Sequence, residues 1–285
     1  MRPAEDLEPL QRMDPLTKGS LFHAIQTEFY RQMQAEDRLP LTPAGLHHAL
    51  QVLDACVEEV AEQEHDQLAP AIERVWKDEI AAIRRDLRLW VDQIAHAEDG
   101  WVPMMFEWAF GLKDGGPLAE GRDARSRRDP VLLDGRFLLH GSIDLVEEHA
   151  TTKAMRVTDH KTGKYRGKDR MVIGGGRTLQ PVLYSMALES ALQRPVVQGR
   201  LYYATSDGGF RDVTIPINDV SRRAGLEALE IIDRAVETGF LAPAPDENAC
   251  TWCDFRPVCG STAERRSHRK SQDAMADLLA LRRKP

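Results

Sequence analysis

An aspartate and a lysine stand two residues apart in VTDHKTGK, residues Val157 to Lys164, at the end of a segment typical of a β-strand. Side chains at i and i+2 share one face of a strand, so Asp159 and Lys161 are expected to point the same way. Thr158 and His160 are expected on the opposite face. A carboxylate beside an ammonium can bind a cation and orient a water molecule, yet an isolated pair of this kind is more often an ordinary salt bridge.

A second aspartate, Asp144, lies inside GSIDLV, an otherwise apolar segment that precedes the first pair. A buried carboxylate without a partner is costly, so Asp144 needs a base, an amide cluster or a metal ion beside it. If the two segments are neighbouring strands, two carboxylates and a lysine come together. Oxygen ligands of this kind suit Mg²⁺ or Mn²⁺. Phosphodiester hydrolysis uses the same groups, because it needs an activated water, a polarised phosphate and a neutralised leaving oxygen.

Three of the four cysteines fall close together in CTWCDFRPVC, at Cys250, Cys253 and Cys259. A CxxC pair can place two sulfur atoms on one ion, as in zinc knuckles and iron–sulfur loops. In a reducing compartment such clustering indicates metal rather than disulfides, with three unliganded cysteines as the alternative. Cys56 falls on the apolar face of an expected helix, where a buried thiol is predicted.

The elements that must position these residues change character near residues 99–100. Apolar residues recur at helical spacing before that point and strand-like segments prevail after it, so the order predicts a mixed α/β sheet flanked by helices, with the first three helices as an N-terminal annex. We expect one integrated domain with three parts: a helical region at 1–98, the core at 99–245, and a cysteine-rich segment with a charged tail at 246–285. The expected helices are at about 20–33, 43–60, 70–97, 178–192 and 220–240, and the expected strands at 102–110, on both sides of Asp134-Gly135, and at 154–159, 196–204 and 210–217.

Composition excludes few functions. A chain of 285 residues, 42% of them hydrophobic, is long enough for one large core. It has no apolar run long enough to span a membrane and no signal-peptide pattern at its start, so the cytoplasm is the expected compartment and no membrane partner is expected. The net charge of −7 does not argue against nucleic acid, because a nuclease needs only a local basic groove. Basic clusters at 122–128, 164–170 and 265–270 are candidates for that groove, or ordinary solvated loops.

Five segments in order resemble the motifs of RecB-like PD-(D/E)XK nucleases, a family that includes the AddB nuclease domain and CRISPR-associated relatives. These are GSLFH near the start, the glutamate of MMFEWAF, GSID, TDHKTGK and QPVLY. The resemblance implies the restriction-endonuclease-like sheet and an active site at known positions. It implies as metal ligands His23, Asp144, Asp159 and the backbone carbonyl of His160, with Lys161 as the catalytic lysine, Gln180 and Tyr184 beside the site on one helix face, and Glu107 as a supporting carboxylate.

The histidine of GSLFH has some support from the residues alone. His23 lies roughly 130° around the helix from the centre of the apolar stripe, so it is not expected to pack in the core. A plain surface histidine is the alternative. For Gln180 and Tyr184 the alternative is ordinary helix packing.

The cysteine triplet resembles the C-terminal triplet of AddB-type nucleases, where a distant N-terminal cysteine completes a [4Fe-4S] cluster. This chain has no cysteine before His23, which departs from that pattern. We therefore expect a domain excised from a longer protein, with an incomplete iron–sulfur cluster or with Zn²⁺ at the triplet, and with His268 as a substitute ligand.

The residue patterns predict a Mg²⁺- or Mn²⁺-dependent nuclease, and the resemblance implies a DNA exonuclease of DNA repair or recombination. The resemblance implies single-stranded DNA or DNA ends as substrate, and a helicase as partner or as part of the parent protein. Two alternatives stay open. One is a catalytically silent DNA-binding scaffold of the same fold, and the other is a protein of unrelated function stabilised by zinc or an iron–sulfur cluster, in which the aspartate–lysine pair is only a salt bridge.

Overall fold

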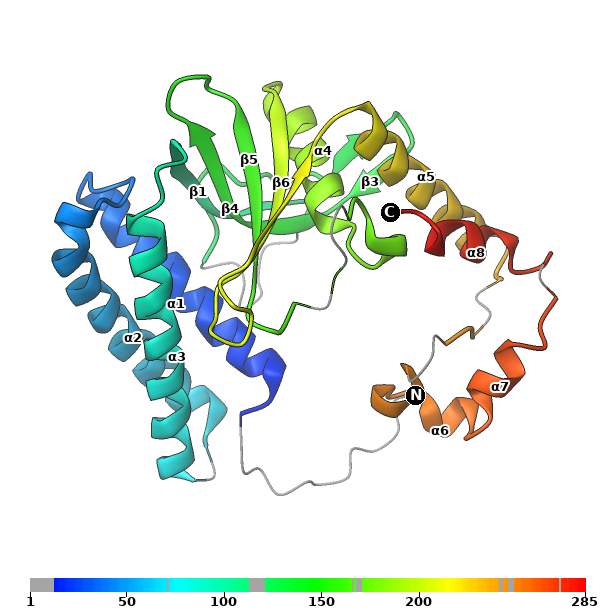
Figure 1. Cartoon of the computed structure of the whole chain (residues 1–285), viewed down its shortest axis with the longest axis horizontal. Helices are drawn as coiled ribbons and strands as arrows, with labels where there is room; N and C mark the ends of the chain where they lie inside the picture. The colour runs from blue at the N-terminus through cyan, green and yellow to red at the C-terminus, as the bar shows by residue number, and fades with distance from the viewer. Residues whose placement is uncertain are drawn as a thin grey trace.

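A five-stranded mixed sheet lies between two groups of helices (Figure 1). The computed structural model describes residues 13–70, 72–112, 121–165, 167, 171–240, 243–245, 249–271 and 273–285. Helices α1, α2 and α3 cover one face of the sheet and α4 covers the other. This arrangement confirms the predicted mixed sheet flanked by helices.

The first helical group begins with α1 (Pro15–Ala35), followed by a short 3₁₀ turn η1 (Pro43–Gly45), α2 (Leu46–Leu68) and α3 (Glu73–Ala95). The start of α1 is fixed by Asp14, whose carboxylate accepts hydrogen bonds from the N–H groups of Leu16 and Thr17 at 3.0 Å. With this cap α1 begins at Pro15, before the start at about residue 20 that the apolar stripe predicts. The buried faces of the three helices share one core with Phe106, Leu145 and Tyr202 of the sheet, so the helices pack directly on it.

The sheet has the strand order β1 (Trp101–Phe110), β4 (Gly141–His149), β5 (Met155–Lys161), β6 (Val196–Tyr203) and β7 (Asp212–Pro216). Only β5 and β6 are parallel, and α4 (Gln180–Leu192) provides the crossover that a parallel pair requires. The strands that carry Asp144 and Asp159 are therefore neighbours, as predicted. Leu145 of β4 pairs with Thr158 of β5, and because the strands are antiparallel, the next position holds Asp144 on β4 and Asp159 on β5.

The hairpin predicted at Asp134-Gly135 is present, but its second arm is shorter than the apolar run suggested. β2 (Val131–Leu133) and β3 (Phe137–Leu139) form a separate two-stranded sheet. The chain then starts the new strand β4 at Gly141, because β4 pairs with β1 and β5 instead of β2. Tertiary pairing thus divides a run that local pattern alone treats as continuous.

The second helical layer sits close to the sheet. A Cβ atom at Gly199 in β6 would come within 2.4 Å of the carbonyl oxygen of Pro181, so α4 can approach β6 only over a glycine.

α5 (Asp219–Glu237) begins at a capping box formed by Asn218 and Ser221. The remaining short elements are η2 (Gly174–Gly176), η3 (Ala249–Trp252), α6 (Arg256–Cys259), α7 (Ala263–Ser267) and α8 (Ala276–Arg282). Among the helices that the structure describes, none is long and apolar enough to cross a membrane.

A charged cluster is buried between the sheet and the first helical group. Glu147 accepts hydrogen bonds from Nε and Nη2 of Arg156 at 2.8 and 2.7 Å and from the hydroxyl of Thr158 at 2.6 Å. The guanidinium of Arg200 lies 3.5 Å from the same carboxylate. Burial alone would raise the pKa of Glu147, but the charges of Arg200 and Arg156 and the hydrogen bonds from Arg156 and Thr158 outweigh it and lower that pKa to about 2.

Candidate active site

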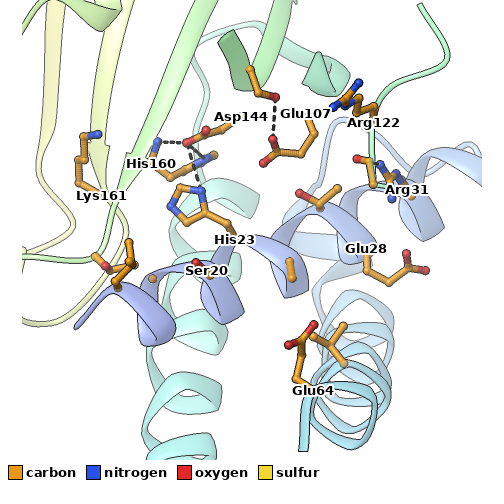
Figure 2. A pocket seen from close by; sticks show the side chains of 18 of the residues that line it. Ser20, His23, Glu28, Arg31, Glu64, Glu107, Arg122, Asp144, His160 and Lys161 are labelled. Atoms are coloured by element: carbon orange, nitrogen blue, oxygen red, sulfur yellow. Dashed lines mark hydrogen bonds and ion pairs between the residues drawn. The ribbon is translucent and has the colours of Figure 1, made fainter. Parts of the chain in front are cut away.

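Three side chains from three different elements converge where α1 meets β1 and β4. His23, Glu107 and Asp144 each offer a ligand atom, and these atoms lie within 4.8 Å of one another. Nδ1 of His23 is 3.4 Å from Oδ2 of Asp144. Figure 2 shows the imidazole and both carboxylates turned toward one another. An imidazole and two carboxylates form a donor set suited to a divalent cation.

The histidine reaches this point because of its place on α1. Leu21, Phe22 and Ile25 are buried in the core, whereas His23 is only partly buried and lines the cavity beside the sheet. The apolar face of α1 therefore holds the helix against the sheet and leaves the imidazole beside Asp144.

Glu107 occupies an unusual backbone conformation. It has φ of +51°, in the left-handed region that side chains other than glycine rarely adopt. It lies between two registered pairs of β1 and β4, Phe106 with Leu145 and Trp108 with Ile143. The hydroxyl of Ser142 donates a hydrogen bond to Oε2 of Glu107 at 2.9 Å, which fixes the carboxylate toward the centre. Strain of this kind often accompanies functional sites, because the surrounding structure must hold it in place.

The strain at Glu107 leads to a testable stability difference. Because glycine tolerates φ of +51° and alanine does not, Glu107→Gly is expected to be more stable than Glu107→Ala by about 1 kcal/mol. Urea unfolding of both variants measures this difference. At Glu148, which is not among the residues of positive φ, the order should reverse, because glycine weakens an ordinary strand position. A Glu107→Gly protein less stable than Glu107→Ala would contradict the strained conformation.

Asp159 and Lys161 lie beside each other at the end of β5. Nζ of Lys161 is 2.5 Å from Oδ2 of Asp159, and it also donates a hydrogen bond to Oε1 of Gln180 at 3.2 Å. Although the ammonium is close, it lies outside hydrogen-bond geometry for Oδ2, and among the described residues no other group donates to that buried oxygen. Asp159 is not one of the three described residues whose ligand atoms lie within 4.8 Å of one another, and its carboxylate lies against Lys161 beside that group.

The first two turns of the crossover helix α4 hold this pair from the other side. A hydrogen bond with Gln180 links the phenol of Tyr184 to the amide that holds Lys161, and burial raises the pKa of Tyr184. A Cβ atom at Gly141 would come within 2.7 Å of the Tyr184 hydroxyl, so the glycine of GSID makes room for this ring. Because Gln180 and Tyr184 are four residues apart, they lie on the same side of α4, where Tyr184 contacts Gln180 and Gln180 contacts Lys161.

His160 contributes through its backbone, while its ring belongs to the core. Its N–H donates a hydrogen bond to Oδ2 of Asp144 at 2.7 Å. Its ring is buried against Trp90 and Tyr202, and burial lowers the pKa of His160 well below its ordinary value, followed by the charge of His23. The imidazole is therefore neutral, which leaves the backbone of His160 as the part that can serve the centre.

The electrostatics of the centre fit a bound cation. Burial raises the pKa of Asp144 well above its usual range, and the nearby charges of Asp159 and Glu107 raise it further. Burial also lowers the pKa of His23, which favours the neutral imidazole that metals bind. A dication at this point would offset the repulsion between the carboxylates and would favour their ionised forms. The residues present thus suit a divalent metal ion.

The centre opens into a cavity of about 700 Å³ between α1, α2 and the sheet. The sequence patterns had not indicated Ser142 or Arg31, although both lie beside this centre or cavity. Ser142 stands two residues before Asp144 on the same strand, so the i and i+2 rule could have found it. Nothing in the sequence marks Arg31, because its role depends on where α1 lies.

The predicted basic clusters are only partly described. Arg122 of the first cluster lines the cavity, whereas Arg166, Lys168 and Arg170 of the second lie outside the described residues.

The cysteine segment forms short turns in η3 and α6, away from the centre in Figure 1. The backbone N–H of Cys250 lies 3.4 Å from Oε1 of Glu264, and the pKa of Cys250 is raised first by burial and then by the charge of Glu264. Within the described ranges, the three cysteines do not form a group with mutual ligand distances of 4.8 Å or less. Cys56 is fully buried, as predicted.

Comparison with known proteins adds an independent finding. The family model described as PD-(D/E)XK nuclease superfamily matches residues 2–260, which is nearly the whole chain. No curated protein matches the chain. The matched range contains the centre, both strands that carry the aspartates, and the cysteine triplet.

Proposed function

This chain belongs to the PD-(D/E)XK nuclease superfamily, and we propose that it is a Mg²⁺- or Mn²⁺-dependent deoxyribonuclease acting on single-stranded DNA or DNA ends. The observation that carries the proposal is the convergence of His23, Glu107 and Asp144 within 4.8 Å, beside the Asp159–Lys161 pair. Such a set of ligands next to a lysine matches the requirements of phosphodiester hydrolysis.

We assign the metal to His23, Asp144 and Asp159, with the carbonyl of His160, and place Glu107 as a further carboxylate at the same point. A bound dication supplies Lewis acidity to the scissile phosphate and lowers the pKa of a bound water. Asp144 is held for this role by the N–H of His160, and Glu107 is held by Ser142. These contacts fix the ligand oxygens before the substrate arrives, which reduces the reorganisation that the reaction requires.

Lys161 is assigned to the attacking water and to the negative charge that develops on the phosphate. Its ammonium lies against Asp159, where it can orient the attacking water and stabilise the negative charge that develops on the phosphate. Gln180 holds the ammonium through its amide oxygen, and Tyr184 in turn holds Gln180. The roles of Gln180 and Tyr184 are therefore to position the lysine.

Cleavage of end-labelled single-stranded DNA tests the proposal. We expect cleavage with Mg²⁺ or Mn²⁺, loss of cleavage in EDTA, and recovery when metal is added back, because the carboxylates cannot neutralise a phosphate without a cation. Binding without cleavage in every metal tested would instead indicate a DNA-binding scaffold. Cleavage that persists in EDTA would contradict the metal assignment.

We extend the proposal to an exonuclease module of DNA repair or recombination that works with a helicase. Its support is the resemblance of five ordered motifs to RecB-like enzymes. Linear and circular single strands of the same sequence distinguish the modes, since an exonuclease degrades only the linear strand.

We also propose that Cys250, Cys253 and Cys259 hold an iron–sulfur cluster or Zn²⁺ in the native protein, on the CxxC spacing. Elemental analysis of protein purified without oxygen and without chelators tests this, and a protein without iron or zinc would reject it.

A further inference from the structure

The cavity extends well beyond the candidate metal centre, along α1. His23 lines one part of it and Arg31 another, and both are on the same helix. At 1.5 Å per residue, eight residues of helix separate them by about 12 Å. This distance exceeds what one phosphate group occupies, so the cavity has room for more of a nucleic-acid strand than the scissile phosphate alone.

Two arginines from separate parts of the chain, Arg31 of α1 and Arg122 of the loop after β1, line that extension. The guanidinium of Arg31 donates a hydrogen bond to the carbonyl oxygen of Gly121, and Nη1 of Arg122 donates to the carbonyl oxygen of Leu112 at 3.3 Å. Figure 2 shows Arg31 and Arg122 on the Glu107 side of the centre. The contact between Arg31 and Gly121 ties α1 to the residue before Arg122, and both arginines line the same cavity.

The position of these arginines relative to Lys161 suggests a path for a polyanion. Lys161 lies on the other side of Asp144 from Arg31 and Arg122 (Figure 2). A strand that crosses the centre would therefore meet a cation on each side of the scissile phosphate. A guanidinium has five N–H donors in a fixed fork, so Arg31 can keep its bond to Gly121 and still bind a phosphate oxygen.

The opposite wall of the cavity has the opposite charge. Glu59 and Glu64 of α2 line it, whereas Glu28 lies on α1 about one helical turn from Arg31. Phosphates are repelled by the two carboxylates of α2, so a nucleic-acid backbone is expected on the side of Arg31 and Arg122, where the two guanidinium groups outweigh the single carboxylate of Glu28. The charge distribution thus selects one path for the strand.

We propose that Arg31, supported by Arg122, binds a non-scissile phosphate of the nucleic-acid strand and positions that strand across the metal centre. This inference rests on the proposed nuclease function. It deepens that function by assigning a phosphate-binding subsite on the Glu107 side, about 12 Å along α1 from His23.

Binding without divalent metal tests the subsite separately from catalysis. Arg31→Gln is expected to weaken binding of a labelled single-stranded oligonucleotide on the order of tenfold, as expected for loss of a charge-assisted hydrogen bond. The association constant should also depend less steeply on salt. The magnitude of the slope of its logarithm against the logarithm of salt concentration should decrease by about 0.7, which is the contribution of one phosphate contact on a single strand. The matched control is Arg38→Gln, an exposed arginine paired with Glu36 outside this cavity, which should change neither quantity.

A second measurement locates the phosphate. Each phosphate of the oligonucleotide is replaced in turn by an uncharged methylphosphonate, and wild type should lose affinity at a position where Arg31→Gln loses none. Arg31→Lys, which keeps the charge, should regain part of the affinity. Thermal unfolding with wild-type cooperativity shows that the variants are folded.

The outcomes separate the two proposals. If Arg31→Gln binds as tightly as Arg38→Gln, or loses affinity equally at every neutralised position, the subsite is rejected even when the enzyme cuts DNA. If the Arg31 pattern appears in a protein that never cuts, the subsite stands and the nuclease function fails.

Discussion

Asp144→Asn is expected to lower kcat/KM for metal-dependent DNA cleavage by on the order of a thousandfold, while metal-free DNA binding is retained. The amide has nearly the same shape as the carboxylate, and it can still accept the N–H of His160. It cannot supply the negative charge that a divalent cation requires beside His23 and Glu107. Single-turnover cleavage across a range of Mg²⁺ concentrations measures the loss.

The same variant is expected to be at least as stable as wild type without metal. Burial and neighbouring carboxylates raise the pKa of Asp144 above its ordinary value. A carboxyl group whose folded pKa is raised destabilises the fold as pH rises above the unfolded value, because folding then opposes its ionisation. Asparagine removes this cost. Added Mg²⁺ should accordingly raise the Tm of wild type and leave that of Asp144→Asn unchanged.

The matched control is Asp134→Asn, the same substitution in the exposed turn between β2 and β3. Asparagine tolerates the φ of +52° found there, so activity and stability should both stay close to wild type. Wild-type cleavage by Asp144→Asn would remove this aspartate from the metal site and with it the central claim about the mechanism.

Glu147→Gln is expected to reduce the free energy of unfolding by about 3 kcal/mol at neutral pH. Lowering the pKa of Glu147 from 4.5 to about 2 corresponds to a stabilisation of that size. The loss is large because glutamine leaves the buried guanidinium of Arg156 without the carboxylate that accepts two of its hydrogen bonds. Urea unfolding at pH 7 measures the difference from wild type.

The pH dependence of this difference has a definite sign. The folded pKa of Glu147 lies below the unfolded one, so its contribution is complete above about pH 4.5 and disappears as pH falls toward 2. The gap between wild type and Glu147→Gln should narrow over that interval.

The neighbouring residue provides the control. Glu148→Gln breaks pairs with Arg194 and Lys153 near the surface, and surface pairs contribute about 0 to 1 kcal/mol. Equal losses for the two variants at neutral pH, or a gap for Glu147→Gln that does not change with pH, would contradict the assigned role of the buried cluster.

The two predictions concern neighbouring parts of β4 with different functions. The negative charge of Asp144 is unfavourable in its buried position without a metal ion, whereas the negative charge of Glu147 is compensated by two arginines. Glu147 belongs to the layer that joins β4, β5 and β6 beneath the first helical group. That layer keeps the strands in the register on which the approach of Asp144 to Asp159 depends.

The sequence by itself determined what depends on short-range periodicity. Alternation placed Asp159 and Lys161 on one face and Thr158 on the other, and the structure has the lysine against Asp159 and Thr158 against Glu147. Helical spacing kept His23 off the apolar face of α1. These features follow from the two-residue and 3.6-residue repeats of the backbone, which are the same in every fold.

Only the tertiary structure decided where the separate elements meet. Glu107 reaches the centre through a left-handed backbone angle inside a strand, which no residue pattern predicts. Arg31 enters the cavity because the core packs α1 at one angle against the sheet, and the second arm of the hairpin is divided because β4 pairs with β1 and β5. These outcomes depend on contacts between residues far apart in the chain, whose energies local propensity does not contain.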